Sequence, residues 1–453
     1  MRKDRLTAIA RHWFEHGVAL QEKRGGARNI EGNAVKRNTV SDHIESFTCR
    51  ASHYARRGAP GRKYLPSDLG VKKMHELFKA QSHAQITYAF YYSVFKYNFN
   101  LGFGHPAKDV CSTCLRFRLQ LKDPDLSDEE KRKESALYLL HRRRGRKFYE
   151  LLNAVEDTFT MCFYMMENLV LPESPIGLTY YSRQLYLYVF GVVRHRGHGQ
   201  MQGKDDIHLF TWLEHQNRKN SNMVASALRY YFDKIVRAEL SRFTTFRLFS
   251  DLCYGQNKNI NIISMLMALR KQKYRNLRIE YTFPIRGHSF LPADRAFGRI
   301  EQEIRKHDTI LLPSDYYEIL KRHGHLHVYN EEWNCYDFKA AVDKLCVSTR
   351  SFKISEARVL EMNSEQLGFK STYCSEYSYH TILKRGKMWE RFHPVIAPDV
   401  NCVKPAKKND VFKLITEMGV DVTTRRYYEG ALVSAGNAAA EQHDLDDSSD
   451  EEQ

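Results

Sequence analysis

Three acidic residues stand at positions where they could bind catalytic metal ions. Enzymes that cleave polynucleotides use two Mg²⁺ or Mn²⁺ ions about 3.5–4 Å apart, and these hard cations bind carboxylate oxygens. Asp251 ends the apolar run FRLFSD, Asp294 opens the helix expected after GHSFL, and Glu301 follows Asp294 by seven residues. Because residues seven apart share one face of a helix, Glu301 competes with Asp294 for a single ligand position.

The expected first strand lacks the acid that such a site requires. Tyr164 stands at the centre of TMCFYMMEN, where an Asp is needed. A phenol has a pKa near ~10, so it is protonated at neutral pH and binds hard cations poorly. Glu167 at the edge of this strand and Glu214 on a later strand are the candidate substitutes. The sequence therefore predicts impaired catalysis. An active nuclease or transposase that binds Mg²⁺ or Mn²⁺ through a substitute acid is the alternative.

A CxxC motif formed by Cys111 and Cys114 has the spacing of a zinc knuckle. A structural zinc takes four ligands, so two more donors are needed. The candidates are Cys49 and His53, spaced C-x3-H, and His141 on a long basic helix. The sequence thus predicts a structural zinc that clamps the N-terminal helices to the rest of the chain. Two unrelated reduced thiols are the alternative.

Basic residues close to these motifs are candidate contacts to nucleic-acid phosphates. Lys258 lies near the expected N-terminus of a helix, where phosphates bind favourably, and His288 lies just before Asp294. A further group follows His141: Arg142, Arg143, Arg144, Arg146 and Lys147. Such charge runs usually form the solvated face of a helix, so a plain surface role and a nuclear-import signal are the alternatives for this group.

Strands and helices must alternate along the chain to bring these residues together. Short apolar and aromatic segments indicate strands, and apolar residues at helical spacing indicate helices. The expected order is three strands (158–166, 183–194 and 206–215), a helix (221–240), a strand (243–253), a helix (257–273), a strand (277–285) and a helix (292–307). This βββαβαβα order resembles the RNase H-like fold of RNase H, retroviral integrases and DDE transposases. That fold is an α/β fold with a mixed sheet covered by helices on both faces.

Composition along the chain predicts five regions. They are a flexible basic arm (1–38), a helical N-terminal region with the CxxC motif (39–150), an RNase H-like core (151–310), a C-terminal α/β extension (311–431) and a disordered acidic tail (432–453).

The charge of the chain favours a polyanionic partner. The 453 residues carry a net charge of +16, and the last thirteen hold seven acids and no Lys or Arg, so the first 440 carry +23. This charge favours nucleic acid, DNA ahead of RNA, over an anionic membrane. No apolar run reaches the ~18–20 residues of a membrane helix, and no apolar signal segment follows the N-terminal charges. The nine scattered cysteines favour a reducing compartment, and the basic stretches favour the nucleus.

Several motifs occur in the order seen in a large metazoan protein family, abundant in arthropods and cnidarians, whose function is not established. They are SHYARRGAPGRKYLPSDLGVKKM (52–74), PAKDVCSTC (106–114), WLEHQNRKNSNMVASAL (212–228), SDLCYGQNKN (250–259) and GHSFLPADRAFGRIE (287–301). The resemblance covers roughly residues 40–430. It implies transposon ancestry and an RNase H-like core.

In that family the first strand carries an Asp followed by a short stretch that ends in Leu-Pro. Counting back eight positions from Pro172 leads to Tyr164. Asp251 and Asp294 match the other acidic positions of the family. We therefore expect a transposase-derived nuclear protein that binds nucleic acid and is catalytically impaired. A protein-interaction adaptor that uses the acidic tail is a second alternative.

Overall fold

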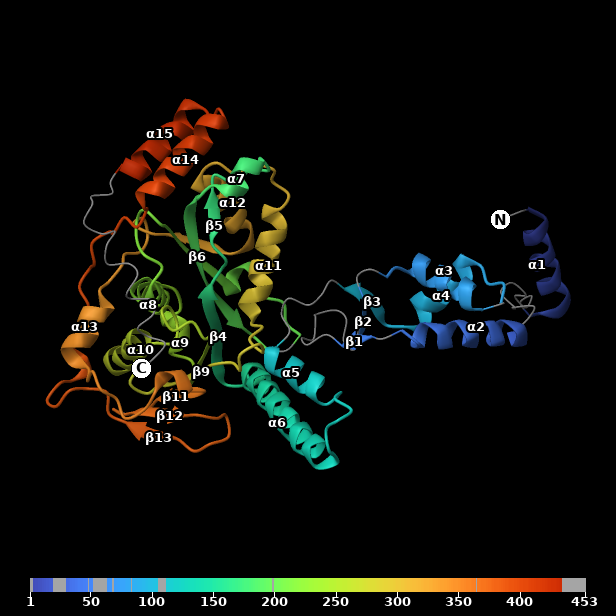
Figure 1. Ribbon diagram of the computed structural model, residues 1–453, viewed down its shortest axis with the longest axis horizontal. Coiled ribbons are helices and arrows are strands. Elements are labelled where there is room, and N and C mark those ends of the chain that lie inside the picture. The colour runs from blue at the N-terminus through green and yellow to red at the C-terminus, as the bar shows by residue number, and fades with distance from the viewer. Residues whose placement is uncertain are drawn as a thin grey trace. The chain divides into compact units, whose positions relative to one another are not determined.

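The computed structural model describes residues 3–18, 30–47, 49–51, 63–66, 69–82, 84–104, 111–197, 199–363 and 365–433. The chain divides into two compact units, residues 1–110 and 111–453. Their elements are labelled in Figure 1. His53 and residues 434–453 of the expected acidic tail lie outside the described residues. None of the described helices is long and apolar enough to span a membrane.

Helices dominate the first unit. Its described elements are α1 (Lys3–His16), α2 (Ile30–Glu45), β1 (Arg50–Ala51), β2 (Lys63–Pro66), α3 (Val71–Gln81), α4 (Tyr88–Asn98) and β3 (Leu101–Gly104). Strand β2 pairs antiparallel with β1 and parallel with β3. Ile44, Phe78 and Tyr91 bring α2, α3 and α4 together in one core. The range 1–38, expected to be a flexible arm, is therefore helical in α1 and at the start of α2.

The second unit contains a ten-stranded sheet. Its helices and strands are α5 (Ser112–Gln120), α6 (Asp128–Asn153), β4 (Thr158–Met165), β5 (Leu169–Leu171), α7 (Gly177–Tyr181), β6 (Leu185–His195), β7 (Ile207–Leu213), α8 (Ser221–Tyr230), α9 (Arg237–Leu240), β8 (Thr245–Ser250), α10 (Ile260–Lys273), β9 (Arg278–Thr282), α11 (Pro292–Ile304), α12 (Pro313–His323), β10 (His325–Val328), α13 (Phe338–Leu345), β11 (Val359–Met362), β12 (Leu367–Lys370), β13 (Ser378–His380), α14 (Pro405–Glu417) and α15 (Val422–Val433).

The strand order of this sheet is β10-β7-β6-β4-β8-β9-β11-β12-β13, and β5 pairs with β6. Strand β6 pairs antiparallel with β4 on one side and with β7 on the other, whereas β8 runs parallel to β4 and β9 runs parallel to β8. Strand β10 adds a parallel edge beside β7, and β11 to β13 add an antiparallel extension beyond β9. The expectation of a mixed α/β fold with a mixed central sheet is confirmed.

Helices cover both faces of the sheet. Since the side chains of a strand point alternately to its two faces, each central strand contributes to two cores. In β4, Phe163 enters the core formed with α8, α10 and α13, whereas Cys162 enters the core formed with α6, α11 and α12. Figure 1 shows α8 and α10 on one side of the sheet and α11 on the other. The expected helix 221–240 is interrupted by a π-helical turn at Tyr231–Ile235.

The boundary between the units lies at Val110 and Cys111, so α5 and α6 belong with the sheet. The expected boundary at residues 150 and 151 does not coincide with it. The reason lies in the C-terminal half of α6, where Phe148 and Leu152 are buried in the same core as α11. Phe148 makes an edge contact with Phe249 at the end of β8, with ring centroids 5.4 Å apart.

Candidate metal centre and acidic site

Four potential metal ligands of the second unit meet in one place. Cys111 is the N-cap residue of α5 and Cys114 lies in its first turn. His141 lies in the middle of α6, and His288 lies in the turn between β9 and α11. The ligand atoms of these four residues all lie within 4.8 Å of one another. The cluster can therefore hold a metal ion.

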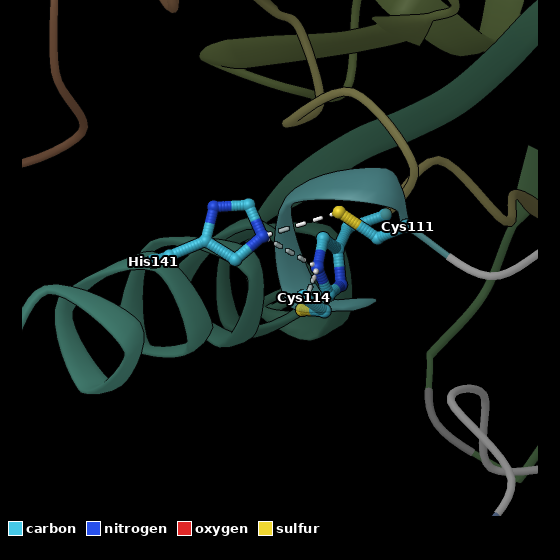
Figure 2. Close-up of side chains that lie close together, drawn as sticks. Cys111, Cys114 and His141 are labelled. Carbon is cyan, nitrogen blue, oxygen red and sulfur yellow. Dashed lines mark hydrogen bonds between the residues drawn. The ribbon is translucent and has the colours of Figure 1, made fainter. Parts of the chain in front are cut away.

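The spacing of the ligand atoms is close to that of a tetrahedral site. The Sγ of Cys111 lies 3.3 Å from the Nε2 of His141, and the Sγ of Cys114 lies 3.4 Å from the Nε2 of His288. The two Nε2 atoms are 3.1 Å apart, and Figure 2 shows the side chains converging. Zn–S bonds of ~2.3 Å and Zn–N bonds of ~2.0–2.1 Å at tetrahedral angles separate the ligand atoms by about 3.3–3.8 Å. Small movements would seat such an ion.

Two glycines allow the segments that carry these ligands to approach closely. Gly287 has a φ of +77° within a turn in which the amide of His288 donates to the carbonyl of Ile285 at 2.8 Å. A Cβ at Gly287 would lie 2.7 Å from the Cβ of Cys111, and a Cβ at Gly145 would lie 3.1 Å from the ring of His288. Any larger residue at Gly287 would push Cys111 and its thiol away from the cluster.

The protonation of the ligands favours metal-coupled proton release. Burial and the neighbouring Cys111 thiol raise the pKa of Cys114 to about 11. Burial, with the charges of Arg144 and Arg116, lowers the pKa of His141. The imidazole is therefore ready to bind a metal in its neutral form, whereas the thiols lose their protons when the ion binds.

Three of the five residues expected to bind zinc meet in the structure. The fourth ligand of the cluster is His288, for which the sequence analysis predicted a different role. Cys111, Cys114 and His141 converge as expected, whereas Cys49 lies in the first unit with its thiol 3.5 Å from the carbonyl of Phe47. His288, which we expected to donate to a phosphate, is 8% exposed and lies within the cluster. That expectation is wrong, because the buried imidazole contacts Cys114 and His141. The turn before α11 is far from α5 and α6 in the sequence, and only the tertiary fold brings His288 next to the other three ligands.

Tyr164 and Asp251 lie on the same face of two neighbouring parallel strands. Phe163 pairs in register with Ser250, so Tyr164 and Asp251 are the next residues along β4 and β8. Both point to the face covered by α11, because residues two apart on a strand share a face and Cys162 and Phe249 belong to that core. Tyr164 also contacts α11 directly, with its ring 5.2 Å from that of Phe297.

The charges of both expected carboxyl groups act on Tyr164. Burial first, and then the charges of Asp294 and Asp251, raise the pKa of Tyr164. The phenol is therefore firmly protonated. The carboxyl of α11 that faces it is that of Asp294, and Glu301 lies two turns further along the helix.

The two aspartates have local structural partners as well. Burial raises the pKa of Asp251, while the amide groups of Asn257 and Cys253 donate to its Oδ1 at 2.6 and 3.1 Å. Asp294 accepts from the amide of Leu291 at 2.6 Å at the start of α11. Lys219, which the sequence analysis did not single out, favours the charged form of Asp251. A protein cation thus acts on one of the two carboxyl groups.

Two expected site residues have other roles. Lys258 is 1% exposed and donates to the carbonyl groups of Ser355 and Ala357, each at 2.8 Å, so its assignment as a phosphate contact is wrong. Glu214, a candidate substitute acid, accepts from Lys407 at 2.7 and 2.9 Å in a buried ion pair. Glu167, the other candidate, is exposed.

A group of exposed arginines lies next to the Cys/His cluster, on the part of α6 that follows His141. The basic ridge, as we name it, consists of Arg142, Arg143, Arg144 and Arg146, which are all exposed. Lys147 is less exposed and bonds Glu150 at 3.0 Å. The ridge contains no acid between its first and last residue, so its charge is available to a ligand in solution.

Comparison with known proteins gives one similarity. Residues 179–377 match the model of a family described as a domain of unknown function, DUF7869. No curated protein matches the chain, and no solved structure matches it. The matched range includes β6 to β12, with Asp251, Asp294 and His288. The chain is therefore similar to DUF7869 over part of its second unit.

Proposed function

We propose that this chain is a transposase-derived protein with an RNase H-like core that binds nucleic acid in the nucleus and cleaves it poorly. The strand order supports the fold assignment. Strands β7-β6-β4-β8-β9 have the arrangement expected of that fold, with three antiparallel strands followed by two that run parallel to the first. The resemblance of the GQNKN and GHSFLPAD motifs to a transposon-derived family supports the ancestry.

The observation that carries the proposal is the environment of Tyr164. The charges of Asp294 and Asp251 both act on this phenol, which lies at the point where a two-metal site requires a third carboxylate. A protonated phenol supplies no negative charge to a divalent cation. The charge of Lys219 on Asp251 further weakens the attraction of the site for metal ions. Binding without efficient cleavage is the function that fits these residues.

The Cys/His cluster fits a structural zinc ion. Two thiolates and two imidazoles form a common zinc ligand set, and four protein ligands leave no open position for a reacting water. The ion would therefore connect α5 and α6 to the turn before α11 and take no part in cleavage. Cys111, Cys114, His141 and His288 would hold it.

The proposed ligand is the phosphate backbone of DNA. The net charge of +23 over the first 440 residues and the exposed basic ridge support a polyanionic partner, and binding that depends on phosphate contacts weakens steeply with salt. The acidic tail, residues 432–453, is a candidate for protein contacts.

The test uses the zinc-loaded full chain. Fluorescence anisotropy with a labelled DNA duplex should show binding at low salt that weakens as salt rises. The same protein with Mg²⁺ or Mn²⁺ should leave the duplex uncut. Absence of binding at low salt would overturn the proposal. Cleavage that is lost in Asp251→Ala would instead assign an active metal-dependent nuclease.

A further inference from the structure

The helix pair α5–α6 has little apolar packing of its own. In α5 the buried residues are Cys114 and Phe117, and Cys114 is a metal ligand. In α6 the buried residues are Gly145, Phe148 and Leu152, which all follow His141 in the sequence. The half of α6 that precedes His141 thus has no fully buried side chain.

The apolar side chains of this pair are largely in contact with water. Five leucines are between 43% and 61% exposed: Leu115, Leu119, Leu137, Leu139 and Leu140. Phe117 packs on the rings of Tyr138 and His141, with centroids 5.8 and 6.4 Å away. Two helices with so small a core are not stable by the hydrophobic effect alone, and natural modules of this size use a metal ion or disulfides instead.

We propose that Zn²⁺ at Cys111, Cys114, His141 and His288 folds the α5–α6 pair against the sheet, and that metal occupancy thereby sets the affinity of the basic ridge for nucleic acid. This inference rests on the proposed function and adds that the metal controls the binding of nucleic acid. Binding free energy of a structural zinc is folding free energy when the site does not exist in the unfolded segment.

The ridge begins directly after the metal ligand His141 and ends within about one and a half helical turns of it. Arg142 directly follows His141, and a Cβ at Gly145 would lie 3.1 Å from the ring of His288. When the ion holds His141 to His288, it also fixes the direction in which the arginines project. Without the ion, α5 and the N-terminal half of α6 lose a connection to the sheet, and the arginines that follow His141 lose their fixed geometry.

The effect of the metal on binding is structural rather than electrostatic. A Zn²⁺ ion with two thiolates and two neutral imidazoles carries no net charge, and two thiols with two neutral imidazoles also carry none. Removing the ion therefore leaves the net charge of the segment unchanged. A loss of affinity after removal reports a loss of structure, not of attraction between charges.

The first experiment measures what the metal does to the fold. The full chain is compared with and without Zn²⁺, removed by a chelator and added back, and deuterium uptake is followed by mass spectrometry. Loss of protection is expected in residues 111–146, which include the basic ridge, with little change in β4, β6 and β8. Equal protection of α5 and α6 in both forms would overturn the inference. Co²⁺ in place of Zn²⁺ should give the visible absorption of tetrahedral thiolate coordination, and an octahedral spectrum would refute the four-ligand assignment.

The second experiment measures binding of a labelled DNA duplex as a function of salt. The ridge variant replaces its four arginines by Gln. A matched control replaces four exposed basic residues by Gln: Lys404, which directly precedes α14, Lys413 of α14, and Arg425 and Arg426 of α15. Each lost phosphate contact reduces the slope of log K, the binding constant, against log salt by about 0.9. The slope of the ridge variant should therefore be smaller by up to about 3.6, and the slope of the control should be almost unchanged.

The outcomes separate this inference from the function on which it rests. If zinc-loaded wild type does not bind at low salt, the proposed function fails. If wild type binds and the ridge variant behaves as the control does, only the inference fails. Chelation should lower wild-type affinity at least tenfold and leave the ridge variant almost unchanged. Equal affinity of zinc-loaded and chelated wild type would also overturn it.

Discussion

Replacing Tyr164 by Asp should recreate a site for divalent cations. The substitution removes a ring that contacts Phe297 at 5.2 Å and puts a carboxylate next to Asp294 and Asp251. Loss of a fully buried aromatic ring costs about 3–5 kcal/mol, and Tyr164 is only partly buried, so its loss should cost less than that. Tyr164→Asn loses the same ring and gains no charge, so it is the matched control. Both variants should be less stable than wild type in the absence of metal, and Tyr164→Asp the less stable of the two because like charges repel.

Added Mn²⁺ should separate the two variants. An ion that binds only the folded state stabilises it by about 2.7 kcal/mol at 100 times its Kd. With ~2.1 cal/mol/K of unfolding entropy per residue, a unit of the length 111–453 gains about 4 °C in Tm. We expect this shift in differential scanning calorimetry for Tyr164→Asp and not for Tyr164→Asn or wild type. Equal responses of the Asp and Asn variants would refute the idea that Asp251, Asp294 and position 164 form one ion site.

Three further substitutions test individual features of the structure. Gly287→Ala, at a positive φ and against Cys111, should weaken zinc binding at least tenfold in a competition titration with a chelator, and unchanged affinity would contradict the close approach. Glu214→Gln should cost about 3–5 kcal/mol in urea unfolding because it leaves Lys407 buried without its partner, and adding Lys407→Met should restore most of the loss; a double variant as unstable as the single one would contradict the pairing. Burial lowers the pKa of Lys258 to about 7 from 10.5, so between these values the unfolded chain binds more protons than the folded one and stability rises with pH. Lys258→Met should flatten that rise between pH 7 and 9.5, and an unchanged slope would show that another group causes it.

The central fold could be predicted because its elements are strongly patterned. The expected strands at 158–166 and 206–215 are β4 and β7 with small changes at their ends. Side chains alternate between the two faces along a strand. This alternation puts Phe163 and Cys162 on opposite faces and Tyr164 and Asp251 on the same face. Strand β5 was missed because three residues carry too little pattern. The pairing of β10 with β7 and of β11 with β9 could not be predicted, since pairing partners far apart in sequence leave no local signal.

The metal centre could be predicted only in part for the same reason. The CxxC spacing identifies Cys111 and Cys114 locally, and His141 lies on a helix expected to be near them. His288 is 147 residues from His141, and its motif gives no sign of metal binding. Lys258 was misassigned because its position at a helix start suggests a surface, whereas tertiary packing buries it.

The distance along the chain between the two histidine ligands has a consequence for synthesis on the ribosome. The segment with the first three ligands leaves the exit tunnel well before the turn that supplies the fourth. At ~5–20 residues per second, 147 residues take about 7–30 s to make. During that interval a nascent chain presents two thiols and one imidazole without their last partner. The complete four-ligand site can therefore form only after His288 has left the tunnel.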